Sequence, residues 1–212
     1  MAMPSFNSSK LKERLTKLNS KQQIAFGALC CERLLPNYLA FQQDSGWGNT
    51  SLVRNALDTV WSYVNEQPEH LLEIQKAVEN CESAIPDSDD FDSLYVTSAQ
   101  DACFAICSLL DYIVDNDLSK IVQAANCSTD SVDLYVQEIE NMSPNDPNLE
   151  QKILMHPLMQ RELSQQESDI EAIAAVQSIS PEFIGQRIAS WNNNGKSNLD
   201  LPRNQVPNLN SE

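Results

Sequence analysis

Basic residues are few in this chain of 212 residues: 14 Lys and Arg stand against 30 Asp and Glu, for a formal net charge of −16. Nucleic acids and anionic membranes repel such a chain unless it holds a strong local basic patch. We therefore expect neither nucleic acid nor membrane as a partner. Charged residues make up 21% of the chain and hydrophobic residues 42%, a balance typical of a folded globular protein. The excess negative charge must then lie on a folded surface.

Long apolar segments are also absent. The longest nearly apolar run covers Ile24 to Cys31, eight residues, which is too short for a signal-peptide core in this context and far too short to span a bilayer. The six cysteines lie mostly in apolar periodic segments of a chain large enough to fold without disulfides. We expect reduced, buried thiols and a cytoplasmic location.

The residue patterns that carry common enzyme chemistry are missing. There are two histidines, His70 and His156, and neither lies at a spacing that pairs it with a nucleophile. No Cys-x-x-Cys motif and no paired Glu-x-x-His motif occurs, and Gly46-Trp47-Gly48 lacks the further residues of a phosphate-binding loop. The sequence therefore leans against an enzyme and predicts no catalytic residue and no cofactor.

Two patterns invite a metal-site interpretation and fail it. Cys103 and Cys107 are four residues apart on a predicted helix, but no second pair at short spacing completes a zinc site. The acidic run from Asp87 to Asp92 places Asp92 where a calcium loop needs glycine. Acids that precede a helix more commonly accept hydrogen bonds from its free N–H groups. We predict no metal site.

Hydrophobic periodicity predicts helices almost throughout the chain, because apolar side chains recur at spacings of three and four and no segment alternates long enough to form a strand. Pro36 is expected to end or kink the second helix. The fold class is therefore all-α: a single-domain, up-and-down-like bundle of about eight to nine helices around a central apolar helix at about residues 98–115. Residues 119–126 and 131–142 are predicted as two separate helices. We expect one domain over residues 1–191 and a flexible Asn-rich C-terminal tail over residues 192–212.

Charge is distributed unevenly along the chain. Residues 1–33 hold six Lys and Arg and two Glu, a net charge of +4, whereas residues 82–140 hold 13 acids and one Lys, a net charge of −12. The basic first helix, about Ser8 to Leu18, is either a docking arm or an amphipathic helix whose cations lie against the acidic body. We predict an acidic face around Asp87 to Asp115 that attracts this helix or a basic partner.

Several segments resemble one known family. They are the run from Leu29 to Tyr38 with Gly46-Trp47-Gly48, the segment from Leu57 to Trp61, the segment from Ala84 to Asp92, and Asp101-Ala102-Cys103. On these residues the chain resembles the YjaG-like family of uncharacterised bacterial proteins, a domain of unknown function, over most of residues 8–175. The resemblance implies a compact, mainly helical, cytoplasmic bacterial domain and carries over no activity.

The candidate ligand-binding or clamping residues are polar and aromatic side chains of the family-like segments: Glu32, Arg33, Tyr38, Trp61, Asp89, Asp90, Asp92 and Asp101. An arginine fork can bind a carboxylate through two parallel hydrogen bonds. We therefore expect Arg33 or Arg54 to lie near an aspartate of the loop from Asp89 to Asp92. The arginine would act there as a structural clamp or at the rim of a ligand cleft.

Three functional hypotheses follow. The leading one is a non-catalytic protein-interaction or regulatory module with an acidic surface, which binds a protein partner or a second copy of itself. The alternative is a small-ligand-binding protein or enzyme with a polar cleft near Glu32, Arg33, Tyr38 and the Asp89–Asp92 loop, because a binding site gathers convergent polar groups in a pocket. A nucleic-acid mimic is a third reading that follows from the negative charge alone.

Overall fold

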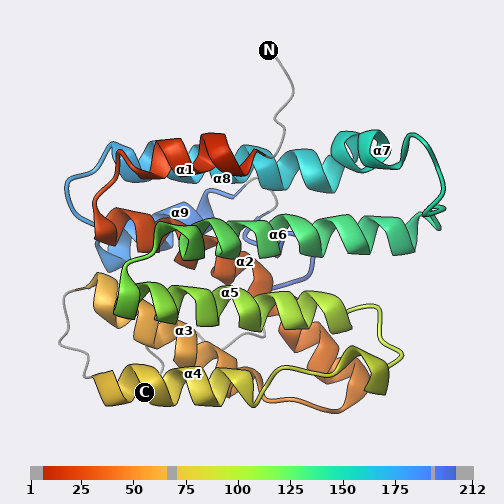
Figure 1. Cartoon of the computed structure of the whole chain (residues 1–212), viewed down its shortest axis with the longest axis horizontal. Helices are drawn as coiled ribbons and strands as arrows, with labels where there is room; N and C mark the ends of the chain where they lie inside the picture. Colours follow the sequence, from red (N-terminus) through yellow and green to blue (C-terminus); the bar gives the residue numbers. More distant parts are fainter. Residues whose placement is uncertain (1–6, 66–70, 192–193, 204–212) are drawn as a thin grey trace.

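The computed structural model describes residues 7–65, 71–191 and 194–203, and within these ranges the chain forms nine α-helices, one 3-10 helix and no strand (Figure 1). This confirms the all-α prediction. The sequence suits Pro68 and His70 to the first turn of a helix, and both residues lie outside the described residues. In chain order the elements are α1 (Ser8–Leu15), α2 (Ser20–Ser45), α3 (Thr50–Val64), α4 (Leu71–Glu82), η1 (Ser88–Asp90), α5 (Val96–Asp115), α6 (Leu118–Ile139), α7 (Leu149–Met155), α8 (Pro157–Ala174) and α9 (Pro181–Ala189).

Two long helices occupy the centre of the bundle. α5 packs against α2, α3, α4 and α6, as expected for the apolar helix predicted at about residues 98–115. α2 is buried still more evenly and packs against α3, α5, α6 and α8. From Ile24 to Tyr38 every residue of α2 is buried. A helix buried on all sides must satisfy every polar group it carries, and α2 carries several.

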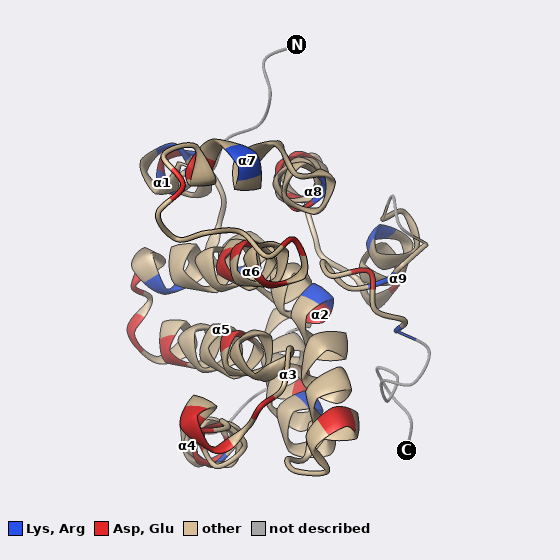
Figure 2. Cartoon of the chain, turned by 90° about the vertical axis from the view of Figure 1, so that its right-hand side faces the viewer, with Lys and Arg blue, Asp and Glu red and all other residues tan. Residues whose placement is uncertain are grey.

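The remaining helices surround these two. In both views α1, α7 and α8 form one edge of the molecule, α6 and α2 follow, then α5 and α3, and α4 forms the opposite edge (Figures 1 and 2). α9 lies to one side of this stack (Figure 2). None of the described helices has the length and apolar character that a bilayer-spanning segment needs.

Pro36 does not end α2, which runs as one helix of 26 residues from Ser20 to Ser45. An internal proline lacks the N–H that would donate to the carbonyl four residues earlier, which here belongs to Glu32. Arg203 supplies the missing donor, because its Nη1 lies 3.0 Å from the Glu32 carbonyl oxygen. The prediction of a break was therefore wrong, and the compensating group comes from the far end of the chain.

α6 also differs from its prediction, because a single helix from Leu118 to Ile139 replaces the two expected ones. Small hydroxyl residues lie in the middle of this helix, and their side chains have partners inside the fold. Thr129 donates to the carbonyl of Asn126, and Ser128 donates to a carboxylate of α8. Polar residues in the middle of the segment therefore mark a polar part of the interior rather than a loop.

The C-terminal segment differs from the expected flexible tail. Residues 194–203 pack against the helices, and Ser197, Asn198 and Leu199 are buried there. Asparagine-rich composition is typical of disorder when nothing binds the amides. Here the Asn198 amide donates to the Ser128 carbonyl oxygen at 2.8 Å and accepts from Asn37 at 2.8 Å. The other residues of the expected tail, 192–193 and 204–212, lie outside the described residues.

The turn between α2 and α3 fixes the position of Tyr38. The Tyr38 hydroxyl donates to the Ala84 carbonyl oxygen at 2.8 Å and accepts from the Asn49 N–H at 3.1 Å. Gly48 has a φ of +99°, and a Cβ placed there would lie 2.7 Å from the Tyr38 hydroxyl oxygen. Both the backbone conformation and the close approach require glycine at position 48.

We expect Gly48→Ala to lower the free energy of unfolding by about 2 kcal/mol or more, because alanine is strained at positive φ and meets the Tyr38 hydroxyl. Gly185→Ala is the matched control, since no atom lies within 4 Å of its added Cβ and the position is an exposed site in α9. It should raise stability by about 0.5–1 kcal/mol. Urea unfolding of both variants tests this, and equal effects would contradict it.

Candidate functional site

Two neighbouring residues of α2 carry opposite charges into the interior. Glu32 and Arg33 are 0% and 2% exposed. Adjacent helical residues point about 100° apart, so their side chains reach different neighbours. A buried charge is very costly unless an opposite charge and hydrogen bonds satisfy it. Each residue therefore needs its own set of partners.

Arg33 binds two carboxylates of α8. Its Nε and Nη2 donate to Glu162 at 2.8 and 2.9 Å, which makes a two-pronged ion pair, and its Nη1 donates to Asp169 at 2.7 Å. Arg187 of α9 donates to the other oxygen of Asp169 at 2.6 Å. We call Arg33, Glu162, Asp169 and Arg187 the inner cluster. Burial opposes the charge on Arg33, but Glu162 and Asp169 outweigh it, and the pKa of Arg33 lies well above its usual value.

Neutral side chains complete the hydrogen bonding of the inner cluster. Ser128 and Gln166 donate to Glu162 Oε1 at 2.8 and 3.0 Å, and Gln165 donates to Asp169 Oδ1 at 3.1 Å. Carboxylate oxygens inside a protein need several donors to offset their lost hydration. The polar residues of α6 and α8 that face the interior thus serve the two acids that bind Arg33.

Glu32 has a second set of partners. Arg54 and Trp61 of α3 both donate to its Oε1, at 2.9 and 2.8 Å, and Arg203 pairs with its Oε2. Asp58 in turn lies 2.7 Å from Arg54 Nη2. We call Glu32, Arg54, Asp58 and Arg203 the outer cluster. Burial raises the pKa of Glu32, but Arg54 and Arg203 outweigh this effect, so the pKa lies below its ordinary value.

Trp191 joins the two clusters. Its ring lies 5.3 Å from the Arg33 guanidinium and 5.8 Å from that of Arg203. A guanidinium over an aromatic face is attracted by the ring quadrupole. Trp191 is 4% exposed, so its ring offers both guanidinium groups a buried neutral surface.

The chemistry of this assembly is that of a clamp. The two clusters contain four arginines and four acids, so their formal charges sum to zero. The thiol of Cys30, which borders Arg33, has its pKa raised by burial, and this disfavours the nucleophilic thiolate. Glu32 is held as a carboxylate by its cations, which makes it a poor proton donor or acceptor near neutral pH. The arrangement binds α2, α3, α8, α9 and the C-terminal segment together.

The structure brings together only part of the predicted set. Glu32 and Trp61 are in contact and Arg33 is adjacent to them, whereas Asp89, Asp90 and Asp92 are exposed. Among the described residues, Arg33 pairs with Glu162 and Asp169, and Arg54 pairs with Glu32 and Asp58. The prediction that either arginine approaches the Asp89–Asp92 loop was therefore wrong. Three of these partner carboxylates, Glu32, Glu162 and Asp169, are buried beside the guanidinium groups, and Asp58 is partly exposed.

Tyr38 and the aspartate loop have separate local roles. The hydroxyl of Tyr38 links α2 to Ala84 and to the residue before α3. In the loop, the Asp87 carboxylate accepts from the Asp89 N–H at 3.1 Å and so caps the short helix η1. Phe91 packs against Phe41, with ring centroids 5.1 Å apart. Capping at the start of a helix is the role that the sequence favoured for this loop.

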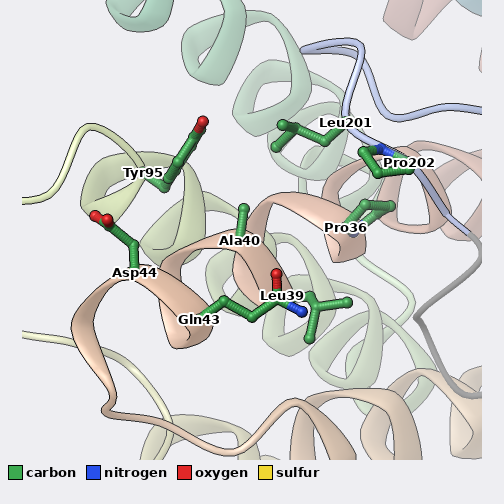
Figure 3. A pocket seen from close by; sticks show the side chains of 8 residues that line it. All are labelled: Pro36, Leu39, Ala40, Gln43, Asp44, Tyr95, Leu201 and Pro202. Atoms are coloured by element: carbon green, nitrogen blue, oxygen red, sulfur yellow. The ribbon is translucent and has the colours of Figure 1, made fainter.

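A pocket of about 350 Å³ lies along α2 from Pro36 to Asp44 (Figure 3). Figure 3 shows Asp44 and Tyr95 at one end and Pro36 with Pro202 at the other. Its lining residues are Pro36, Leu39, Ala40, Gln43, Asp44, Tyr95, Leu201 and Pro202. None of the candidate residues from the sequence lines this pocket. The pocket is therefore a different site from the polar cleft predicted near Glu32, Tyr38 and Asp89–Asp92.

Asp101 lies apart from both clusters, on α5. Burial, with a smaller contribution from Asp130 of α6, raises the pKa of Asp101 to about 7. Its Oδ2 is buried and has no hydrogen-bond partner among the described residues. Burial and then Asp133 also raise the pKa of Asp130. These carboxyl groups repel one another and have no counterion comparable to the arginines of the two clusters.

Sequence reasoning missed most partners of Glu32 and Arg33. Glu162 and Asp169 are seven residues apart, and Gln165 and Gln166 lie between them, so the four form a polar stripe on the inner face of α8. That spacing is a usable signal, because polar residues at helical period mark one face. Arg187, Asn198 and Arg203 had no comparable signal, since they lie in a short helix and a segment whose composition suggests disorder.

Over its described residues the chain is thus an all-helical bundle protein whose centre holds a self-neutralised group of buried charges. A family model described as a protein of unknown function, DUF416, matches residues 10–201. The chain belongs to this family. The match extends into the C-terminal segment as far as Leu201, beyond the residues 8–175 over which the sequence resemblance was expected.

Named relatives agree with this assignment. The chain is 28% identical over 189 residues to the uncharacterised protein YjaG of Escherichia coli K12, covering 89% of this chain and 94% of that protein. It is 31% identical over 129 residues to an uncharacterised protein of Haemophilus influenzae, covering 60% and 65%. A crystal structure of a DUF416 family protein from Shewanella baltica superposes with a TM-score of 0.77 at 26% identity, covering 89% of this chain and 96% of that one.

Asp101 gives the protein a pH-dependent stability term. An unfolded aspartate titrates near about pH 4, whereas the folded group titrates at about pH 7. The folded protein therefore holds this proton more tightly, and stability is lost as pH rises from about 4 through about 7. Asp101→Asn removes the ionisation. We expect the variant to raise the melting temperature clearly at pH 8 and less at pH 5.

Thermal unfolding by circular dichroism at the two pH values measures this difference. Asp90→Asn is the matched control, because Asp90 is exposed and the substitution should change the melting temperature little at either pH. An Asp101→Asn effect of equal size at pH 5 and pH 8 would show that ionisation of Asp101 does not cost stability.

Proposed function

We propose that this protein is a non-catalytic protein-interaction module that binds a basic partner through the exposed face of α5 and α6. The buried charges support this reading because they satisfy one another and tie helices together. The chemistry left to recognise another molecule lies on the surface. The cytoplasmic location expected from the sequence belongs to the same proposal, since six cysteines without disulfide partners suit a reducing compartment.

The face of α5 and α6 carries a large share of the negative charge. From Val96 to Glu140 the chain has eight acidic residues and one lysine. The lysine, Lys120, pairs with Asp111 at 2.9 Å. The two helices pack side by side along the front of the molecule in Figure 1, and Figure 2 shows acidic residues on α4, α5 and α6. A basic partner would find acids here that have few cations of their own.

The observation that carries the proposal is an exposed phenylalanine within this acidic face. Phe104 is 43% exposed on α5. Phe104, Asp111 and Asp115 follow one another at spacings of seven and four, so they share one side of the helix. Leu134 of α6 is 46% exposed. Exposed aromatic residues surrounded by charge are typical of interfaces, where the apolar group provides burial and the charges provide steering.

The arginine of the basic first helix, α1, does not pair with the acids of this face. Arg14 pairs instead with Glu167 of α8, and Leu11 and Leu15 pack into the core. Lys12 lies near enough to Asp117 to help lower the pKa of that aspartate, after hydrogen bonds from Ser119. The amphipathic-helix reading of α1 thus fits its contacts, and the face centred on Phe104 is left to another molecule.

The test compares variants as bait for affinity capture at low and high salt, with bound proteins identified by mass spectrometry. Phe104→Ala and the pair Asp111→Asn with Asp115→Asn should each lose the same salt-sensitive partner, because they remove the apolar anchor and the attracting charge. Met155→Ala, 53% exposed on α7, and the pair Asp89→Asn with Asp90→Asn are matched controls that should retain it. The proposal fails if test and control variants capture the same proteins in the same amounts.

Self-association is measured separately by the elution volume of the purified chain in size-exclusion chromatography. A dimer that dissociates in Phe104→Ala but not in Met155→Ala would mean that the same face binds a second copy. A dimer unaffected by both variants would place self-association elsewhere.

A further inference from the structure

The described C-terminal segment, residues 194–203, forms a compact loop of its own, which we call the latch. Ser197 organises it. The Ser197 hydroxyl accepts from the Leu199 and Leu201 N–H groups at 3.0 and 3.1 Å, and the Ser197 N–H donates to the Leu201 carbonyl oxygen at 2.9 Å. These three bonds lie within the latch and involve no group of the helices.

The latch binds the bundle at consecutive polar groups of α2. Arg203 donates to the Glu32 carbonyl oxygen at 3.0 Å, and the Asn198 N–H donates to the Arg33 carbonyl oxygen at 3.3 Å. The Asn198 side chain accepts from Asn37 at 2.8 Å. Backbone carbonyls in the middle of a helix normally bind the same helix and are closed to other segments.

Pro36 explains why the Glu32 carbonyl is available. The absent N–H of Pro36 leaves the Glu32 carbonyl without its intrahelical donor, and a proline ring pushes against that turn of the helix. Arg203 therefore satisfies two acceptors of the same residue, the carbonyl and the carboxylate of Glu32. The proline creates the docking point and the arginine fills it.

The latch also forms a wall of the pocket beside α2. Leu201 and Pro202 line this pocket together with residues of α2 that include Pro36 (Figure 3). Leu199 adds an apolar anchor, since it is 3% exposed in a small cluster with Val132 and Val136 of α6. A further contact comes from α8, where Arg161 pairs with Asp200 at 3.0 Å and donates to the Asn198 carbonyl oxygen at 3.3 Å.

We propose that the latch is a conformational device that opens as a unit while the helices stay folded, and that Arg203 at the Pro36 gap is its catch. Opening requires the loss of the polar contacts that Asn198, Asp200 and Arg203 make with the helices and the exposure of Leu199, while the internal hydrogen bonds of the latch are kept. A segment outside the helices that polar contacts hold in place opens locally at lower cost than central helices. An open latch uncovers Glu32 and Asn37 and removes one wall of the pocket.

Amide hydrogen exchange of the full chain tests the proposal. The amide of Asn198, whose N–H donates to the Arg33 carbonyl and is released when the latch opens, should exchange faster than the amides of α5. Arg203→Gln should accelerate the Asn198 amide by about 10- to 100-fold, the effect of losing hydrogen bonds to a charged group, and leave α5 unchanged. In a Pro36→Ala background the alanine N–H binds the Glu32 carbonyl, so the acceleration caused by Arg203→Gln should shrink by about fivefold.

Arg161→Gln is the matched control, because it removes latch contacts that do not involve the Pro36 gap. It should accelerate the Asn198 amide by the same factor in both backgrounds. Two outcomes overturn the proposal. One is that the Asn198 amide and the α5 amides exchange at one common rate, which means opening only by global unfolding. The other is an Arg203→Gln effect of equal size in the wild-type and Pro36→Ala backgrounds.

Discussion

Two adjacent residues of opposite charge, Glu32 and Arg33, are buried in the central helix, and their burial dictates what surrounds them. A helix at the centre of a bundle cannot expose either group to water, so other elements must deliver partners on both sides of α2. α8 supplies two carboxylates to Arg33, α3 supplies Arg54 to Glu32, and α9 and the latch supply further arginines.

This arrangement also decides where function is to be sought. The two clusters sum to zero charge, so the formal net charge of −16 belongs entirely to residues outside them. Much of that excess lies on α5 and α6, around an exposed aromatic side chain. The charges of the two clusters neutralise one another, so the uncompensated charge of the molecule lies outside them. Membership of the DUF416 family carries no activity that competes with this view.

Periodicity predicted the helices well because it reports one local property, the side of a helix that faces the core. It could not predict that α2 passes through Pro36, since the compensating donor, Arg203, is 167 residues away along the chain. The same limit applies to the partners of Arg33. A buried arginine needs a carboxylate partner, but the sequence does not distinguish Glu162 from the aspartates of the Asp89–Asp92 loop as that partner. Tertiary packing makes the choice. For Asn198 the composition of the segment suggested disorder. Composition does not show that Asn37 and Ser128 bind the amide of this residue.

A double-mutant cycle between Arg33 and Glu162 measures how strongly the buried pair holds α2 to α8. The free energies of unfolding of the wild type, Arg33→Met, Glu162→Gln and the double variant give the coupling between the two side chains. If the buried charges organise the fold, each single variant leaves a charge unpaired in the interior, and the coupling is on the order of 2 kcal/mol or more. Additive effects, with a coupling near zero, would mean that the pair does not hold the bundle together.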